Sequence, residues 1–287
     1  MVSRTRAAVA TLASAVLATA GLSATVAPAG AAPTWAPADS ATIHPGIQMY
    51  TDGAQCTGNF VFTDGADNVY VGYAAHCAGT GGATETNGCD SGSLPLGTKV
   101  DFVEGGSLVT SGEKVGTGTL VYSSWLAMQQ AGTTDANACD YNDFALVKVD
   151  AEYVDDVNPS IPFWGGPVGI DTDGTAAGET VYSYGNSSLR GGIEQLSPKQ
   201  GTSLGTSGDG WTHPVYTVTP GVPGDSGSAF LDAEGNALGT LSTLAIAPLA
   251  GSNGVGDLNH ELEFAKAHSG IAGLALAPGT EPFSPAL

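Results

Sequence analysis

Charged residues are scarce in this sequence, and basic residues are the scarcest of them. Lys and Arg together number 8 of the 287 residues, against 28 for Asp and Glu, and the formal net charge at pH 7 is −20. A surface with such an excess of carboxylates repels nucleic acid and anionic membranes. We therefore expect no nucleic-acid partner, and the charge alone identifies no other partner.

Cysteine is also sparse, and the chain contains no C-x-x-C pair. The spacing that is typical of a structural zinc site is therefore missing, and we expect no metal ion. The four cysteines are Cys56, Cys77, Cys89 and Cys139. An even number of cysteines in an exported chain predicts disulfides, although four cysteines permit three pairings.

A long apolar run occurs only near the N-terminus. Arg4 and Arg6 precede an Ala-, Val- and Leu-rich stretch over residues 7–26, and small residues follow at 29–31. This order is the pattern of a secretory signal peptide, which we assign to residues 1–31. A membrane anchor is the alternative, but an Ala-dominated stretch fits it less well. We predict a secreted, extracellular protein without membrane contact after cleavage.

Glycine, by contrast, is abundant at 42 residues, and turn residues separate short β-branched or aromatic runs. This combination is typical of many short strands joined by tight turns. The expected strands are 59–62, 69–71, 99–103, 118–123, 144–149, 179–184, 215–218, 228–231 and 237–241. Convincing helical spacing is confined to residues 258–268, before Gly270, and so the sequence predicts an all-β chain with a C-terminal helix.

A proline-containing stretch over residues 157–162 divides the expected strands into two groups. We expect a disordered leader or short pro-segment at 32–42 and a first β-barrel at 43–157. A second β-barrel, with the C-terminal helix and tail, is expected at 158–287. The length that remains after residue 31 is sufficient for two small barrels that share an interface.

Three short motifs, in the order His, Asp, Ser, carry reactive side chains. They are Ala74–Cys77 with His76, Asn142–Val149 with Asp143, and Gly224–Ser228 with Ser226. Asp143 is preferred over the nearby Asp135 and Asp140 because it opens an apolar strand, whereas the other two lie in a polar, turn-like stretch.

The three residue types complement one another chemically. A serine hydroxyl is a poor nucleophile at neutral pH and needs a base to accept its proton. Histidine suits that task because its ordinary pKa is about 6.5, and a carboxylate can orient the imidazole and stabilise its cation. We therefore predict that Ser226 is a nucleophile, His76 a general base and acid, and Asp143 the orienting carboxylate.

Together the motifs resemble the chymotrypsin-like serine peptidases of the secreted bacterial type, from about Ile43 to the C-terminal helix. The resemblance implies two packed six-stranded antiparallel β-barrels with the active site between them. It also implies hydrolysis of a protein or peptide substrate through an acyl-enzyme, without a cofactor, and we expect a monomer. The N–H groups of Gly224 and Ser226 would form the oxyanion hole.

The resemblance further implies a disulfide between Cys77 and Cys56, which lies one hairpin earlier, and this leaves Cys89 and Cys139 as a second pair. Trypsin-like members carry an acid six residues before the nucleophile, where this chain has Pro220, and so trypsin-like specificity is not expected. Three residues are candidates for substrate binding: Pro220, Ser242 and Leu244. Ser242 is also expected beside Asp143, and Leu244 at the pocket wall would favour apolar or small side chains.

In this family the acid before the nucleophile is buried and paired with a new N-terminus or an internal arginine. Arg190 is the single arginine that remains after signal cleavage. Because an unpaired buried carboxylate is costly, we hypothesise a pair between Asp225 and Arg190. A solvated Arg190 is the alternative.

Other interpretations stay open at the level of sequence. The chain could be a catalytically silent secreted binding module on the same fold, or a serine esterase. Residues 171–174 (Asp-Thr-Asp-Gly) suggest calcium at first sight, but they lack the remaining ligands of an EF-hand loop and predict a turn.

Overall fold

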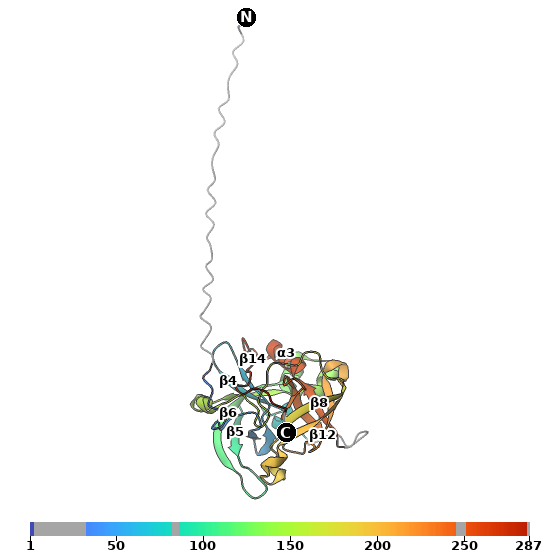
Figure 1. The fold of residues 1–287 in the computed structure, drawn as a ribbon. Coiled ribbons are helices and arrows are strands. Elements are labelled where there is room, and N and C mark those ends of the chain that lie inside the picture. The colour runs from blue at the N-terminus through green and yellow to red at the C-terminus, as the bar shows by residue number, and fades with distance from the viewer. Residues whose placement is uncertain (3–32, 82–85, 245–250, 286–287) are drawn as a thin grey trace.

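The computed structural model describes residues 1–2, 33–81, 86–244 and 251–285, and these form a β-rich molecule (Figure 1). The expected signal peptide lies almost wholly outside the described residues. Within the described ranges, no helix is long and apolar enough to cross a membrane.

The first half of the chain, together with one short strand from the C-terminal tail, forms an eight-stranded antiparallel sheet in the order β14-β3-β4-β7-β6-β5-β1-β2. The strands are β1 (Gln48–Thr51), β2 (Ala54–Thr57), β3 (Val61–Thr63), β4 (Val69–Tyr73), β5 (Lys99–Glu104), β6 (Glu113–Ser123), β7 (Ala145–Val149) and β14 (Ala275–Leu276). Burial alternates along much of β6, as expected where every second side chain faces a core. The central strand β4 is buried throughout.

This sheet differs from the closed six-stranded barrel that we expected at 43–157. Its hydrogen-bonded order ends at β14 and β2, and β14 comes from the C-terminal tail that we assigned to the second barrel. Ala275 pairs with Thr63, and the Ala277 N–H donates to the Val61 carbonyl at 2.9 Å. An edge strand leaves a row of backbone groups unpaired, and the returning tail covers that edge of β3.

The second half forms the predicted closed six-stranded barrel, in the order β10-β13-β12-β11-β8-β9. The strands are β8 (Ala177–Tyr184), β9 (Pro198–Leu204), β10 (Thr212–Thr217), β11 (Ala229–Leu231), β12 (Ala237–Leu244) and β13 (Asn253–Asp257). Their inward side chains form a compact apolar core of Val181, Val215, Phe230, Leu238, Leu241 and Val255.

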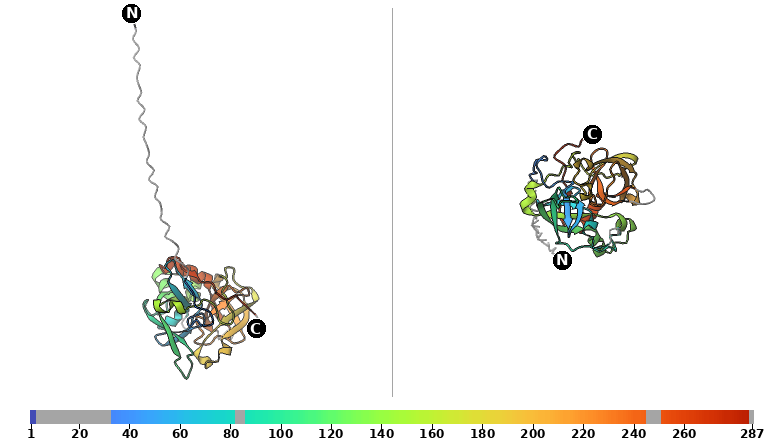
Figure 2. Two further views of the ribbon diagram at one scale, coloured as in Figure 1. Left: turned by 60° about the vertical axis from the view of Figure 1, so that its left-hand side comes forward. Right: turned by 90° about the horizontal axis from the view of Figure 1, so that it is seen from below.

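The two halves lie side by side, the first blue to green and the second yellow to orange (Figure 2). A second apolar cluster spans both, since it joins Phe60 and Leu146 of the first half to Tyr182 and Leu231 of the second. Burial of this shared surface fixes the halves against each other. Residues contributed by both halves can therefore hold a constant geometry.

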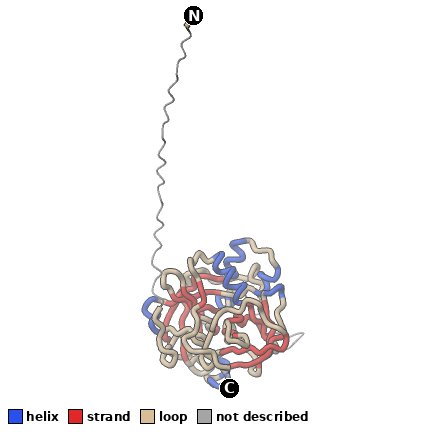
Figure 3. Tube along the Cα trace, turned by 45° about the horizontal axis from the view of Figure 1, so that its top comes forward, coloured by secondary structure: helices blue, strands red, loops and turns tan. Residues whose placement is uncertain are grey.

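Helices lie around the strands rather than between them (Figure 3). The predicted C-terminal helix is α3 (Leu258–His268), and the Asp257 side chain caps it by accepting from the His260 N–H at 2.8 Å. Two helices were not predicted: α1 (Ser124–Ala131) and α2 (Ala136–Tyr141). The 3₁₀ turns are η1 (Ala75–Ala78), η2 (Ala151–Asp156), η3 (Ser188–Arg190), η4 (Glu194–Leu196) and η5 (Gly208–Gly210).

The segment 32–42, which we expected to be a disordered leader or a short pro-segment, makes defined contacts where the structure describes it. The Ala36 N–H donates to the Val157 carbonyl at 3.0 Å, and Asn158 Nδ2 donates to the Ala36 carbonyl at 2.7 Å. Trp35 packs against the core of the first sheet. These contacts join the segment to the connection between the halves, and so this part is not disordered.

Candidate active site

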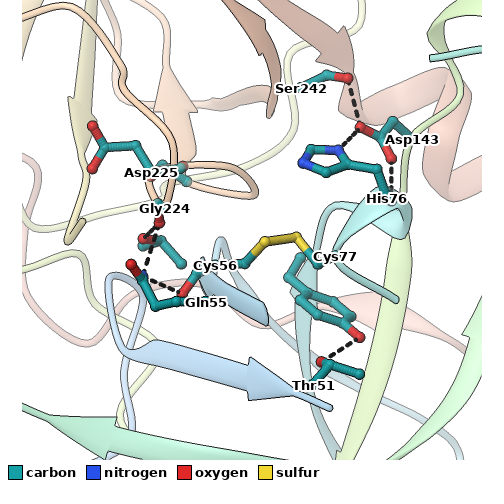
Figure 4. The surroundings of a disulfide bond; sticks show 12 residues. Thr51, Gln55, Cys56, His76, Cys77, Asp143, Gly224, Asp225 and Ser242 are labelled. Atoms are coloured by element: carbon teal, nitrogen blue, oxygen red, sulfur yellow. Dashed lines mark hydrogen bonds and ion pairs between the residues drawn. A yellow bond between two sulfur atoms is a disulfide. The ribbon is translucent and has the colours of Figure 1, made fainter. Parts of the chain in front are cut away.

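His76 lies in the 3₁₀ turn η1, directly after β4 (Figure 4). The turn is fixed on both sides. The Ala75 N–H donates to the Asp143 carbonyl at 3.2 Å, and Cys77 forms a disulfide with Cys56 of β2, with an S–S distance of 2.01 Å. The second disulfide joins Cys89 to Cys139 at 1.97 Å. Both pairs agree with those that the resemblance implied.

Asp143 lies just before β7 and is 3% exposed. Its Oδ2 is 2.6 Å from His76 Nδ1, and its Oδ1 accepts the His76 backbone N–H at 2.8 Å. Ser242 Oγ, on β12, donates to the same Oδ2 at 2.5 Å, where we expected Ser242 to lie. Figure 4 shows the imidazole held at Asp143, with its other edge directed toward the side where Gly224 and Asp225 lie.

These contacts shift both pKa values. Burial alone would raise the pKa of Asp143, but the charge and hydrogen bonds of His76 and the hydroxyl of Ser242 lower it below the ordinary value. For His76, burial lowers the pKa, whereas the charge and hydrogen bond of Asp143 raise it by more, and the net shift is upward. The pair therefore favours the charged form of Asp143, and it makes His76 easier to protonate than a free imidazole.

A second buried acid, Glu261 of α3, lies behind Asp143 and was not predicted. Its Oε1 accepts the Asp143 N–H at 3.3 Å, and its Oε2 accepts the Thr240 hydroxyl at 2.7 Å. Burial raises the pKa of Glu261 well above its ordinary value. The available signal in the sequence was an acid on the helix face that also presents Leu258 and Leu262, which are both buried.

The loop that carries Ser226 rests on the first half of the molecule. The Ser226 carbonyl accepts the Thr57 N–H at 2.8 Å, and the Gly224 carbonyl accepts the Thr57 hydroxyl at 2.7 Å. A Cβ on Gly227, where φ is +90°, would lie 2.9 Å from the nitrogen of Ala74. Only glycine permits this approach, which brings the serine loop to the strand end that precedes His76.

The backbone N–H groups of the serine loop, residues 224–228, fall into two sets. Three of them have acceptors: the Asp225 N–H donates to the Val222 carbonyl at 2.8 Å, the Gly227 N–H to the Leu241 carbonyl at 2.7 Å, and the Ser228 N–H to the Asp225 carbonyl at 3.0 Å. Among the described residues, none accepts from the N–H of Gly224 or of Ser226. These are the two donors predicted for an oxyanion hole.

Ser226 itself is partly exposed. In the described part of the chain, no hydrogen bond joins its hydroxyl to His76. Hydrogen bonds between a nucleophile and its base are often long without substrate and tighten when substrate binds. The structure thus brings His76, Asp143 and Ser242 into direct contact and places the Ser226 loop beside them.

Asp225 is fully buried, and Arg190 NH2 donates to its Oδ2 at 2.5 Å. The hypothesis of an Asp225–Arg190 pair therefore agrees with the structure, and the solvated alternative does not. A second cation was missed: Nζ of the buried Lys199 is 3.3 Å from the same oxygen. Lys199 lies on β9, which we did not predict, and so its inward direction could not be inferred from the residues around it.

In the described chain, neither Pro220 nor Leu244 forms a hydrogen bond with His76, Asp143 or Ser226. The exposed Pro220 accepts from Arg190 NH2 at 2.8 Å through its carbonyl, and Leu244 is 43% exposed at the end of β12. The buried Asn253, which was not predicted, links these regions. Its Oδ1 accepts the Gly221 N–H at 2.8 Å and its Nδ2 donates to the Thr243 carbonyl at 3.2 Å.

The described residues contain one cluster of possible metal ligands, made of Cys56, His76 and Cys77. Both sulfurs belong to the same disulfide and cannot act as thiolates. Because metal binding to cysteine needs the thiolate, this donor set does not fit a metal ion.

No protein-family model and no curated protein matches the chain. Among solved structures, it is similar to Thermobifida fusca protease A at 18% identity, over 83% of this chain and 99% of that chain, with a TM-score of 0.48. It is similar to Nocardiopsis protease at 16% identity (82% and 98%; TM-score 0.46) and to Cellulomonas bogoriensis chymotrypsin at 18% (82% and 98%; TM-score 0.46). Because each of these TM-scores is below 0.5, the proposal below rests on the geometry of this chain.

Proposed function

We propose that the protein is a secreted serine endopeptidase. One observation carries the proposal: the buried Asp143 carboxylate holds the His76 imidazole beside a serine loop whose N–H groups at 224 and 226 have no acceptor in the described chain. General base, carboxylate, nucleophile and oxyanion donors are the parts that acyl transfer through serine needs. The two disulfides are consistent with an oxidising, extracellular location.

In the proposed reaction, the Ser226 hydroxyl attacks the carbonyl carbon of the scissile peptide and transfers its proton to His76 Nε2. Asp143 stabilises the resulting imidazolium through Nδ1. The N–H groups of Gly224 and Ser226 bind the oxyanion, and one such donor typically lowers the barrier by about 3–4 kcal/mol. His76 then protonates the leaving amine. In the second half of the reaction, water attacks the acyl carbon while His76 accepts its proton, and His76 returns a proton to the Ser226 oxygen as the acyl bond breaks and the acid leaves.

Trypsin-like specificity is not part of the proposal. Pro220 offers no carboxylate to a Lys or Arg side chain, and its carbonyl already accepts from Arg190. We also propose that Leu244, which is apolar and 43% exposed at the end of β12, lies at the pocket wall and favours apolar or small side chains. A peptide-library cleavage profile measures this preference directly.

Turnover of matched peptide and ester substrates by the wild type and by Ser226→Ala tests the proposal. Peptide hydrolysis that Ser226→Ala abolishes is the expected result. Ester hydrolysis without peptide hydrolysis would instead identify an esterase. A folded wild type that turns over neither substrate would identify a silent binding module.

A further inference from the structure

Lys199 is a lysine with no solvent exposure, on β9 of the second barrel. Its Nζ lies 3.3 Å from Asp225 Oδ2 and 3.5 Å from the Leu196 carbonyl oxygen. Lysine is seldom fully buried, because removing an ammonium from water is costly unless a partner compensates. The position of Lys199 therefore needs an explanation beyond packing.

Its partner, Asp225, immediately precedes Ser226, and two backbone N–H groups from different segments donate to its carboxylate. Asp225 Oδ1 accepts the Ser187 N–H at 3.0 Å, and Oδ2 accepts the Val222 N–H at 3.1 Å. A Cβ on Gly185 would lie 2.5 Å from Asp225 Oδ1 and 2.8 Å from Lys199 Cε, and so the packing here is tight. Asp225 joins the two peptide groups between Gly224 and Ser226, and so its carboxylate anchors the chain between these residues.

The two cations on Asp225 occupy different surroundings. Arg190 contributes to the wall of a cavity of about 450 Å³, which is also lined by Ser187 and Glu194, whereas Lys199 is not among the lining residues. Arginine alone already neutralises the carboxylate. The second, fully buried cation is therefore not required for charge balance.

We propose that Lys199 is a positioning residue: with Arg190, its ammonium fixes Asp225 and so keeps the N–H groups of Gly224 and Ser226 aligned for the oxyanion. The inference rests on the proposed peptidase function and deepens it. In this proposal, two internal cations, Arg190 and Lys199, hold the serine loop in its active conformation through Asp225.

The two cations differ in their response to pH. Burial lowers the pKa of Lys199, Asp225 raises it and Arg190 lowers it further, and the result is about 8. Among the described residues, the charged groups that act on its ammonium are Asp225 on the serine loop and Arg190 on η3, while Ser183, its partner on β8, is uncharged. A guanidinium keeps its charge throughout this range. Lys199 therefore loses its proton near pH 8, while Arg190 still holds Asp225.

The test compares Lys199→Met, Arg190→Gln and the matched control Lys266→Met, which removes an exposed lysine paired with Glu263 on α3. kcat and KM for a peptide substrate are measured between about pH 6 and pH 10, a range that extends to both sides of the Lys199 pKa of about 8. Wild type is expected to show a decline in kcat centred near pH 8. Lys199→Met should lower kcat about tenfold at neutral pH with KM nearly unchanged, because only transition-state binding is impaired. The variant should also lack the decline near pH 8, because the group that titrates there has been removed.

Arg190→Gln supplies a second readout that does not depend on how well Lys199→Met folds. Removal of the guanidinium should raise the pKa of Lys199, and so the decline in kcat should move to higher pH. A folded Lys199→Met with the wild-type kcat and pH profile would overturn the inference. So would an unchanged profile in Arg190→Gln. A wild type without any turnover would instead overturn the proposed function, and this inference with it.

Discussion

At the scale of single residues, the site is organised by hydrogen bonds that converge on buried carboxylates. Asp143 accepts from the His76 backbone and from Ser242 and faces the His76 ring. Asp225 accepts from two backbone N–H groups and from Arg190. These donors offset part of the cost of burying a carboxylate.

The raised pKa of His76 gives the first prediction. The imidazole must be neutral to accept the Ser226 proton, and so kcat/KM should fall as the pH drops through a midpoint above the ordinary value of 6.5. Asp143→Asn removes the charge that raises this pKa, and it should shift the midpoint downward and lower the rate about 10⁴-fold. A pH–rate profile of both proteins provides the check. A midpoint unaffected by Asp143→Asn would contradict the assigned pair.

The second prediction concerns Asp171, whose Oδ1 accepts the Gly174 N–H at 2.6 Å. Its pKa is raised to about 6, chiefly by burial and further by the neighbouring Asp232 and Asp173 carboxylates. The folded state thus binds more protons than the unfolded state between the ordinary value of 3.8 and about 6, and stability should fall as pH rises through this window.

Asp171→Asn removes that titration and should raise the melting temperature by about 2–5 °C above pH 6, with the gain disappearing toward pH 4. Thermal unfolding across this range measures it, with the exposed Asp39→Asn as control. A variant less stable than wild type at pH 7 would show that Asp171 is needed as a carboxylate, for example as a cation ligand.

At the scale of elements, strands and helices were predictable where local pattern and burial agree. The bounds of α3 matched the prediction because its apolar face repeats with helical spacing and Asp257 caps it. The strand β13 was missed because Asn253–Asp257 contains two glycines, which disfavour a strand. Pairing with β10 and β12 overrides that preference. The short helix α2 is held by the Cys89–Cys139 disulfide, a long-range contact that local spacing does not reveal.

Glu261, on α3, gives the third prediction. Because burial favours its neutral form, Glu261→Gln should keep the contacts to Asp143 and Thr240 and be at least as stable as wild type at neutral pH. Glu261→Ala leaves two buried polar groups and a cavity and should lose about 2–4 kcal/mol. Urea unfolding separates the two variants.

The stability difference between wild type and Glu261→Gln should also depend on pH. The folded state favours the protonated carboxyl, and so the stability of wild type relative to Glu261→Gln should decline as pH rises above the ordinary pKa of 4.5. A large loss of stability in Glu261→Gln at pH 7 would mean that the carboxylate is charged and needed in that form.

At the scale of the whole molecule, the sequence sufficed for the parts that depend on short motifs. It predicted the second barrel, the contact of His76 with Asp143, and the pairing of Asp225 with Arg190. It could not predict Lys199 or Glu261, because their roles arise only when distant strands bring them behind the site. The tail strand β14 was hidden for the same reason, since two residues carry no strand signal by themselves.

The two disulfides should differ in function, and this is the fourth prediction. Cys56–Cys77 links β2, which holds the Ser226 loop, to the turn that carries His76. Cys56→Ser with Cys77→Ser should therefore lower kcat at temperatures where the protein remains folded. Cys89→Ser with Cys139→Ser is the matched control and should cost about 2–5 kcal/mol of stability with kcat preserved. Equal effects on kcat would contradict this division.

Mass spectrometry of the intact protein after reaction with a fluorophosphonate tests the central claim most directly. We predict one covalent adduct that maps to Ser226, formed by wild type and lost in Ser226→Ala. His76→Ala should react at least about 100-fold more slowly, because the hydroxyl loses its base. Labelling of another residue, or no labelling of the folded wild type, would contradict the account.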